Sequence, residues 1–476
     1  MLNSVNMALE HQNFLRFMWD NKIYQYTCLP NGLACAPRFF TKLMKPVSAK
    51  LGSLGFVNVG YIDDSLLCGD TKRECQENVF ETTSLMKELG FMINVEKSVL
   101  VPQKQITSLG NIIDSDQMIV ILPTEKQEII VNECKKLFKR DKDTIRNVAK
   151  VIGLIVSTFS AVQYGKLHYR QLEQGKILAL KRFKGNYDTY MTITLEMKEE
   201  LAWWFTNIYI QKRDISHGVP EKILNTDASL QGWGAVMLSE KIGGKRTQSE
   251  SLKHINYLEI LAIYYALQAF HDLVKNTHIK ILTDNSTAVS YINNMGGVKS
   301  DNCNLISKKI WIWCIKHNIW ISCSHIAGKK NIEADKKSRI FNDDLEWQLN
   351  LKKIQNIVEK WGKPDIDMFA SRLNNQVKAY CSWKPDPYSV FVDAFTVDWK
   401  QFKLIYMFPP FSLLGSCIKK IRLEEANAVV VAPLWPTQPW FNRLMEMLVD
   451  QPTLFQRKKD MIFMPHKAAT LHSRKL

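Results

Sequence analysis

The sequence lacks the features that mark secreted, membrane-spanning and zinc-binding proteins. None of its ten cysteines forms a CxxC pair or lies at a Cys/His spacing typical of a zinc site. No run of 18 apolar residues occurs, and the first residues carry neither the apolar block nor the small-residue cleavage site of a signal peptide. No internal repeat or low-complexity tract is apparent. We therefore expect an intracellular protein, cytoplasmic or nuclear, with reduced thiols and no membrane partner.

What is present is an ordinary globular composition with a basic charge. The 476 residues are 46% hydrophobic and 23% charged, which is enough chain for about three cores of roughly 150 residues. Lysine and arginine (63) exceed aspartate and glutamate (47), and the formal charge of +16 is spread along the chain. A dispersed basic excess suits a polyanion such as nucleic acid. A well-solvated surface explains the charge equally well.

Apolar periodicity divides the chain into five regions. Short strand-like runs and turns fill residues 1–122, and apolar residues at three- and four-residue steps predict an all-helical connector over 123–220. Strands alternate with helices over 221–342, which is typical of an α/β layer structure. A charged helical linker follows over 343–363, and a compact region rich in Pro and Trp over 364–476. The predicted fold class is multidomain α/β and α+β.

A pair of adjacent acids lies between two apolar runs in the first region. Asp63 and Asp64 follow Tyr61-Ile62, with apolar residues on both sides. The pattern predicts a β-hairpin with buried arms that carries both carboxylates at its tip. Adjacent acids at a rigid tip can hold a divalent metal, although an Asp-Asp turn is more often a solvated loop.

Four further segments lie on either side of this tetrapeptide: Phe14-Leu15-Arg16-Phe17, Leu29-Pro30-Asn31-Gly32-Leu33-Ala34-Cys35-Ala36-Pro37-Arg38-Phe39-Phe40, Leu89-Gly90-Phe91 and Ser108-Leu109-Gly110. In this order and spacing, they resemble the successive palm motifs of reverse transcriptases, in particular those of gypsy-type and DIRS-like retrotransposons. The similarity continues through residues 146–153 and 168–170, which resemble the helical thumb and connection.

This resemblance implies a partial reverse-transcriptase palm over 1–122 and a thumb and connection over 123–220. Asp63 and Asp64 would be metal-binding catalytic residues. The implied nucleic-acid-binding positions are Gly32, Pro37, Tyr61 and Lys97.

One part of the polymerase pattern has no counterpart here. The family takes a further aspartate from an earlier strand, which would lie just before Ser4-Val5-Asn6, and basic fingers that grip the incoming triphosphate. A lone pair of acids cannot position the two metal ions of nucleotidyl transfer. We therefore expect Asp63 and Asp64 to be polymerase residues by descent, and no DNA synthesis by this chain alone. A fragmentary gene model or a decayed element would explain the difference.

Four further acids stand in separate contexts in the region 221–342. Asp227 and Asp284 each follow a threonine at the end of a buried strand, so both can face one metal. Glu259 lies near the start of a helix, where Asn256 three residues earlier has the form of a capping box. Asp335 begins a later helix, where the helix dipole favours an acid. Taken singly, each acid has a structural explanation.

Together and in this order, the four acids resemble the Asp-Glu-Asp-Asp set of ribonuclease H. Residues 325–339 resemble the retrotransposon version of the last motif. Gathering four carboxylates is unfavourable unless cations intervene, so the grouping predicts two bound Mg²⁺ or Mn²⁺ ions. These would activate a water and steady the leaving 3′ oxygen. The resemblance implies that the substrate is the RNA strand of an RNA–DNA hybrid, with template RNA and DNA as partners.

The expected ribonuclease H pattern shows one departure. Many members carry a histidine in a flexible loop just before the last acid. Here Lys329 and Lys330 occupy that region, and His325 lies earlier, at the expected end of a strand. Turnover could suffer from this change without loss of the metal site.

The last region contains, in order, Asp367-Met368-Phe369-Ala370, Asp398-Trp399, Phe408-Pro409-Pro410-Phe411-Ser412 and Val429-Val430-Val431-Ala432-Pro433. In this order, these segments resemble the Dam-like adenine methyltransferase domain of DIRS-like elements. In active enzymes of that type, Asn or Asp precedes a Pro-Pro-aromatic turn and binds the adenine amino group. Here Phe408 takes that position, and a phenyl ring cannot accept the hydrogen bonds. We therefore favour a degenerate, structural or nucleic-acid-binding domain and expect no bound S-adenosylmethionine. The candidate remnants of a cofactor pocket are Asp367, Pro409, Pro410 and Phe411.

Three hypotheses result. The leading one is a retrotransposon reverse transcriptase and ribonuclease H fragment that hydrolyses hybrid RNA with two metal ions. Its rival is a non-catalytic nucleic-acid-binding relic, and the third is a DNA adenine methyltransferase. Hybrid cleavage, hybrid binding without cleavage, and methyl transfer would distinguish them.

Overall fold

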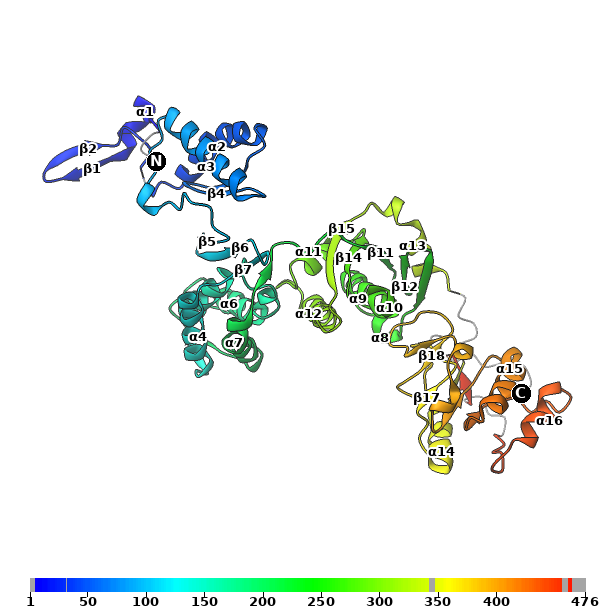
Figure 1. Cartoon of the computed structure of the whole chain (residues 1–476). Helices are drawn as coiled ribbons and strands as arrows, with labels where there is room; N and C mark the ends of the chain where they lie inside the picture. Colours follow the sequence, from blue (N-terminus) through cyan, green and yellow to red (C-terminus); the bar gives the residue numbers. More distant parts are fainter. Residues whose placement is uncertain (1–4, 31, 342–346, 456–460, 465–476) are drawn as a thin grey trace. The chain divides into compact units, whose positions relative to one another are not determined.

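A computed structural model describes residues 5–30, 32–341, 347–455 and 461–464. The chain divides into two compact units, Met1–Pro123 and Thr124–Leu476 (Figure 1). All ten cysteines are free thiols. Within the described ranges, no helix combines the length and the apolar character needed to cross a membrane.

The first unit combines short antiparallel strands with two long helices. Apolar side chains of α2 and α3, among them Val47, Leu51 and Met86, form its core. Strand β1 pairs with β2, β3 with β4, and β6 with both β5 and β7. The elements are α1 Leu9–Gln12, β1 Arg16–Trp19, β2 Lys22–Gln25, α2 Ala36–Ser53, β3 Val57–Tyr61, β4 Asp64–Cys68, α3 Lys72–Glu88, β5 Gln105–Ser108, β6 Asn111–Asp114 and β7 Ile119–Ile121.

The second unit begins with four helices. These are α4 Thr124–Phe138, α5 Ile145–Val156, α6 Arg170–Arg182 and α7 Leu195–Asn207, followed by the short strand β10 Arg213–Asp214. The expectation of an all-helical connector is incomplete, because β8 Lys142–Thr144 pairs with β9 Tyr190–Thr192. Strands of three residues are too short to show a period of two in the sequence.

The partly buried ring of His168 makes this helical region sensitive to acid. The ring stacks on Trp203 at a centroid distance of 4.0 Å. Burial lowers the pKa of His168 to about 3, and nearby Lys308 adds to the shift. The unfolded chain takes up this proton near pH 6.5, so protonation favours unfolding as the pH falls below that value. We expect a loss of up to about 1.4 kcal/mol per pH unit.

Urea denaturation at pH 7.5 and 5.5 would measure this effect. We expect the stability of His168→Phe, which keeps an aromatic ring but cannot be protonated, to be higher relative to the wild type at pH 5.5 than at pH 7.5. His11→Phe, at an exposed histidine of the first unit, is the control. Equal losses in wild type and His168→Phe would contradict the prediction.

A five-stranded mixed sheet follows the helices. Its order is β13-β12-β11-β14-β15. Neighbours among β13, β12 and β11 run antiparallel, whereas β11, β14 and β15 run parallel. The strands are β11 Lys222–Ala228, β12 Gly232–Met237, β13 Glu240–Lys245, β14 His278–Thr283 and β15 Trp320–His325. The alternation of strands and helices predicted for this region is confirmed.

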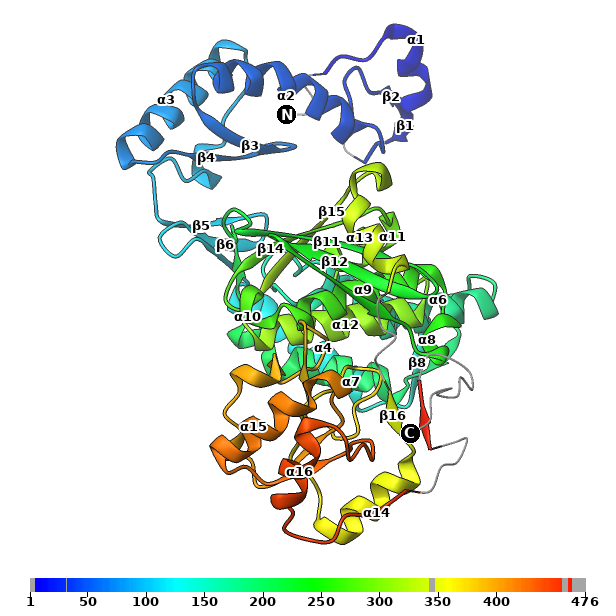
Figure 2. The same cartoon turned by 90° about the vertical axis from the view of Figure 1, so that its right-hand side faces the viewer.

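Helices cover both faces of this sheet. Helices α9 and α12 lie against one face and α13 against the other (Figure 2). All side chains of α9 from Leu258 to Leu267 are buried, which is expected of a helix packed between a sheet and further helices. The helices are α8 Gln248–Ser251, α9 Ile255–Ala269, α10 His271–Val274, α11 Ser286–Asn293, α12 Asp301–Lys316 and α13 Ile332–Arg339.

The C-terminal region is built on a small parallel sheet in the order β17-β20-β21. Of the helical linker expected over 343–363, α14 is present, and 343–346 lie outside the described residues. The elements are β16 Gln348–Leu349, α14 Leu351–Trp361, β17 Ile366–Asp367, β18 Cys381–Ser382, β19 Phe391–Val392, β20 Ile405–Met407, α15 Leu414–Glu424, β21 Ala428–Val430, α16 Pro439–Glu446 and β22 Ile462–Phe463. The multidomain α/β organisation is thus confirmed.

Candidate metal centre

Three of the four acids predicted in the region 221–342 converge at one edge of the five-stranded sheet. Asp227 lies near the end of β11, Asp284 directly follows β14, and Glu259 projects from α9. One carboxylate oxygen of each lies within 4.8 Å of the others. The cause is the parallel register of β11 and β14, in which Asn225 lies opposite Leu282, so that the chain continues to both aspartates at the same edge.

The electrostatics of these carboxylates favour a cation. Burial raises the pKa of Asp227 to about 6, and the carboxylates of Asp284 and Asp335 add to the shift. Burial, with Asp227 and Asp284, raises the pKa of Glu259 to about 8. Glu259 Oε2 is buried and has no hydrogen-bond partner within the described part of the chain. A buried carboxylate oxygen without a donor is costly, and oxygen ligands are those that Mg²⁺ prefers. The three acids therefore fit a divalent metal.

The helix-capping explanation for Glu259 is wrong. Helix α9 begins at Ile255, and its N-cap is His254, whose Nδ1 accepts a hydrogen bond from the Asn256 amide at 3.1 Å. The Asn256 side chain instead accepts from Asn285 Nδ2 at 3.0 Å. Glu259 therefore lies inside the helix, 5% exposed, where capping cannot explain it.

Asp335 lies near this group but is not part of it. It lies in the first turn of α13, and Arg339 Nε is 2.7 Å from its Oδ1. Its side chain is 42% exposed. Asp335 nevertheless raises the pKa of Asp227, so the two carboxylates repel each other. The structure thus brings together three of the four predicted acids, whereas the fourth, Asp335, forms an ion pair with Arg339.

Sequence reasoning missed the polar side chains that hold these acids. Ser338 Oγ, which is buried, donates a hydrogen bond to Asp227 Oδ2 at 2.6 Å. Asn331 Nδ2 donates to the carbonyl oxygen of Thr226 at 2.9 Å. A Cβ atom on Gly328 would lie 2.9 Å from Asp284 Oδ2, so this glycine leaves room for the carboxylate. The sequence offered one signal for Ser338: it lies three residues after Asp335 in an expected helix, and residues at this spacing lie on the same face of a helix.

Ser338→Ala tests how firmly Asp227 is held. The change removes a hydrogen bond that lowers the pKa of Asp227, and we expect Mn²⁺ binding to weaken about tenfold, as is typical when a partner of a metal ligand is lost. Mn²⁺ titration followed by electron paramagnetic resonance would measure this. The control is Ser157→Ala, at an exposed serine after α5. Equal affinities for wild type and Ser338→Ala would contradict the expectation.

The positions that depart from the ribonuclease H pattern lie beside the same edge. His325 ends β15 and pairs in register with Thr283. Lys329 and Lys330 lie in a 3-10 turn, Gly328–Lys330, just before α13. The strand end predicted at His325 is therefore confirmed.

The hairpin with the two adjacent aspartates is present in the first unit. Tyr61 pairs with Asp64, and Ile62 at the tip has a φ of 54°. The prediction that its arms are buried is wrong, because Val57 and Val59 are 58% and 59% exposed. The strands form a two-stranded sheet that contacts α3 through Asn78. Among the residues that the structure describes, Asp63 and Asp64 belong to no group of three side chains that could hold a metal ion.

The four positions expected to contact nucleic acid come from separate elements of the first unit. Tyr61 ends β3 and is 58% exposed. Gly32, with a φ of 91°, lies in the loop before α2, and Pro37 lies in the first turn of that helix. Lys97 ends a 3-10 turn capped by the side chain of Asn94.

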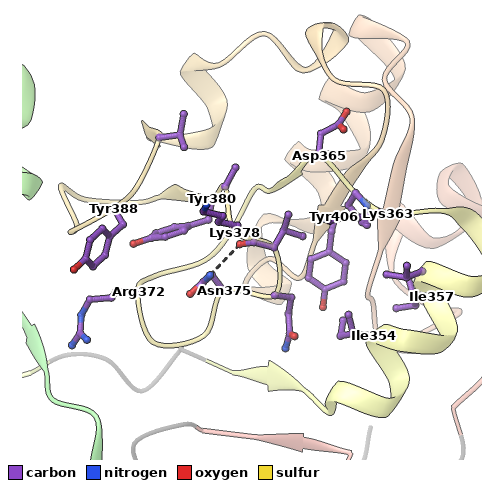
Figure 3. A pocket seen from close by; sticks show the side chains of 16 residues that line it. Ile354, Ile357, Lys363, Asp365, Arg372, Asn375, Lys378, Tyr380, Tyr388 and Tyr406 are labelled. Carbon is purple, nitrogen blue, oxygen red and sulfur yellow. Dashed lines mark hydrogen bonds between the residues drawn. The ribbon is translucent and has the colours of Figure 1, made fainter. Parts of the chain in front are cut away.

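The C-terminal region contains a cavity of about 1040 Å³ (Figure 3). Its lining includes Ile357, Lys378, Tyr380, Tyr388 and Tyr406, but none of the predicted cofactor positions. Those positions are Asp367, Pro409, Pro410 and Phe411.

Two of these positions, Asp367 and Phe411, have structural roles. Asp367 is fully buried and accepts hydrogen bonds from the amides of Phe369 and Gln376, and burial raises its pKa to about 7. The ring of Phe411 packs edge-on against Trp435 at 5.3 Å.

Two family models match the chain. Residues 4–113 match the model described as reverse transcriptase (RNA-dependent DNA polymerase). Residues 220–313 match the model described as the RNase H-like domain found in reverse transcriptase. The second match contains Asp227, Glu259 and Asp284. The chain therefore contains a reverse-transcriptase domain and an RNase H-like domain.

Curated relatives of the chain include viral polyproteins. The chain is 25% identical over 333 residues to the genome polyprotein of Petunia vein clearing virus. This alignment covers 68% of this chain and 14% of that protein. It is 23% identical over 347 residues to the enzymatic polyprotein of Figwort mosaic virus, covering 70% of this chain and 48% of that protein. The chain thus spans at most about half the length of these relatives.

Solved structures give weaker similarities. The foamy viral protease-reverse transcriptase in complex with RNA/DNA hybrid matches with a TM-score of 0.40 at 15% identity, over 68% of this chain and 42% of that one. Ribonuclease H1 from Halobacterium salinarum matches with a TM-score of 0.22 at 15% identity, over 24% of this chain and 92% of that one. Scores of this size do not define a common fold for the whole chain.

Proposed function

We propose that this chain is a metal-dependent ribonuclease H that hydrolyses the RNA strand of RNA–DNA hybrids. The observation that carries the proposal is the convergence of Asp227, Glu259 and Asp284 within 4.8 Å at one sheet edge. These three residues are separated by up to 57 positions in the sequence, yet each offers a carboxylate oxygen to the same point. The match of this segment to the RNase H-like domain of reverse transcriptases supports the same chemistry.

The three carboxylates would act mainly by binding divalent metal ions, and the positive charge of these ions would offset the repulsion between the acids. Bound divalent ions would supply an activated water and stabilise the leaving 3′ oxygen. Asp227 is oriented by Ser338, and Glu259 presents an oxygen that lacks a protein donor in the described residues. We propose Asp335 as a fourth ligand, which would have to exchange its ion pair with Arg339 for the metal.

Cleavage of a labelled RNA–DNA hybrid tests the proposal. We expect Mg²⁺- or Mn²⁺-dependent cleavage by the wild type and a loss of at least about a hundredfold in Asp284→Asn, because a neutral amide is a poor ligand for these ions. Asp272→Asn, at an acid that is 99% exposed on α10, is the matched control. A hybrid that is bound but stays intact with either ion would support the rival, a non-catalytic nucleic-acid-binding relic.

We further propose that this chain does not extend a primer by itself. Nucleotidyl transfer needs ligands for two metal ions, and Asp63 and Asp64 belong to no cluster of three ligating side chains within the described residues. Primer extension on an RNA template would test this, and templated synthesis by the purified chain would contradict it. A DIRS-like or gypsy-type origin rests on the sequence motifs around these acids.

A further inference from the structure

A buried arginine joins the C-terminal region to the RNase H-like domain. The Arg372 side chain is 9% exposed. Its Nη1 donates to Glu250 Oε1 at 2.8 Å, and its Nη2 donates to the carbonyl oxygen of Lys245 at 2.7 Å. Its guanidinium lies 4.5 Å from the ring centroid of Tyr265. Figure 3 shows Arg372 and Tyr388 at one end of the cavity lining. The ring of Tyr388 also packs edge-on against that of Tyr265, with a centroid distance of 6.3 Å.

The residues that contact Arg372 lie on two consecutive helices, Glu250 in the first turn of α8 and Tyr265 in the C-terminal half of α9. Glu250 caps α8, because its Oε2 accepts from the Thr247 amide at 3.0 Å. The same carboxylate accepts a hydrogen bond from the hydroxyl of Tyr265 on α9. Arg372 therefore contacts both partners of the hydrogen bond that links α8 to α9.

This network reaches the candidate metal centre through α9. Tyr265 and Glu259 lie on the same helix, six residues apart. Arg246, only 4% exposed, donates Nη2 to the carbonyl oxygen of Leu258, the residue before Glu259. Arg246 is also attracted by the carboxylates of both Glu250 and Glu259. Arg372 thus forms an ion pair with Glu250, and Arg246 interacts electrostatically with both Glu250 and Glu259.

We propose that Arg372 is a positioning residue for Glu259. The C-terminal region would then help to hold a metal ligand of the ribonuclease H site in place. This rests on the proposed function. Without Arg372, Glu250 loses its ion-pair partner, although Arg246 still attracts it. The Glu250 side chain is only 16% exposed, and a largely buried carboxylate is destabilised when it loses an ion-pair partner. We therefore expect the α8–α9 connection to loosen and Glu259 to be held less firmly.

The experiment compares Arg372→Ala with wild type in the full chain. We expect Mn²⁺, titrated by electron paramagnetic resonance, to bind about tenfold more weakly, the lower end of the range for lost supporting interactions. The Mg²⁺ concentration for half-maximal hybrid cleavage should rise by a similar factor, with a smaller change in the rate at saturating Mg²⁺. Arg443→Ala, at an exposed arginine of α16 in the same region, should leave both values unchanged.

Arg372→Lys keeps the charge but cannot make both hydrogen bonds in the same geometry. We expect it to bind Mn²⁺ with an affinity between those of wild type and Arg372→Ala, and it serves as the test if the alanine variant does not fold. Folding is checked by circular dichroism at the temperature of the titration.

The possible results separate the two proposals. Wild-type affinity for Mn²⁺ in folded Arg372 variants, beside a wild type that binds Mn²⁺ and cleaves hybrid, would overturn the positioning role and leave the proposed function intact. A wild type that binds no Mn²⁺ and cleaves no hybrid would overturn both. A lower melting temperature with unchanged Mn²⁺ affinity would assign Arg372 a purely structural role and would also overturn the inference.

Discussion

Glu259→Gln is expected to stabilise the metal-free second unit and to abolish its stabilisation by Mg²⁺. Glu259 is 5% exposed, has a buried oxygen without a hydrogen-bond partner among the residues that the structure describes, and lies beside two other carboxylates. Burial and these neighbours raise the pKa of Glu259 to about 8, which means that its ionised form is disfavoured there. A neutral amide of nearly the same shape removes both the repulsion and most of the desolvation cost.

Thermal unfolding at pH 8 with and without Mg²⁺ would measure both effects. We expect the metal-free variant to be more stable than the wild type by about 1–3 kcal/mol, equivalent to one or two units of differential pKa. For the wild type, Mg²⁺ at a hundred times its dissociation constant should add about 2.7 kcal/mol, and for the variant close to nothing. A metal-free variant less stable than the wild type would contradict the view that these acids oppose folding until a cation binds.

Glu240→Gln is the matched control for this experiment. Glu240 is an exposed acid that begins β13 in the same sheet. Its replacement removes one negative charge without changing the three-acid group. We therefore expect its Mg²⁺-dependent shift to equal that of the wild type.

The central part of the candidate site could be predicted from the sequence because it depends on short-range patterns. Asp227 lies near the end of one strand and Asp284 directly follows another, and parallel neighbouring strands end at the same edge of a sheet. The helix expected to begin near Glu259 is present as Ile255–Ala269. The same reasoning placed His325 at a strand end.

Features that depend on partners distant in sequence could not be predicted. Strand β13 contains two glycines and ends in charged residues, so its local pattern does not favour a strand. Arg372 and Glu250 are 122 positions apart, and nothing near either residue indicates the other. For the hairpin at Asp63, the apolar pattern predicted buried arms that are exposed in the structure. An apolar strand is buried only where another element covers it, and the local sequence does not show whether one does.

The glycines of the sheet explain the second large effect that we expect. Helix α13 lies directly on β12 and β13. A Cβ atom on Gly234 would lie 2.2 Å from the carbonyl oxygen of Ala334 and 2.6 Å from the amide nitrogen of Ser338. One on Gly243 would lie 2.5 Å from the carbonyl oxygen of Lys337. These atoms belong to the backbone of α13, so only a shift of the whole helix could relieve the contact.

We expect Gly234→Ala to destabilise the second unit by about 3 kcal/mol, the upper part of the usual range for overpacking, and to abolish hybrid cleavage. The loss of activity follows because α13 carries Ser338, which holds Asp227. Urea denaturation and the hybrid-cleavage assay would measure the two effects. Activity retained together with wild-type stability would show that α13 can move away without cost.

Gly175→Ala provides an informative comparison because its predicted contact is even shorter. A Cβ atom there would lie 1.8 Å from Met197 Cε. That atom, however, is the end of a flexible side chain, which can change rotamer. In addition, alanine in place of glycine inside α6 stabilises a helix by up to about 1 kcal/mol. We therefore expect Gly175→Ala to be nearly neutral, so that the rigidity of the contacted atom, more than its distance, decides the cost.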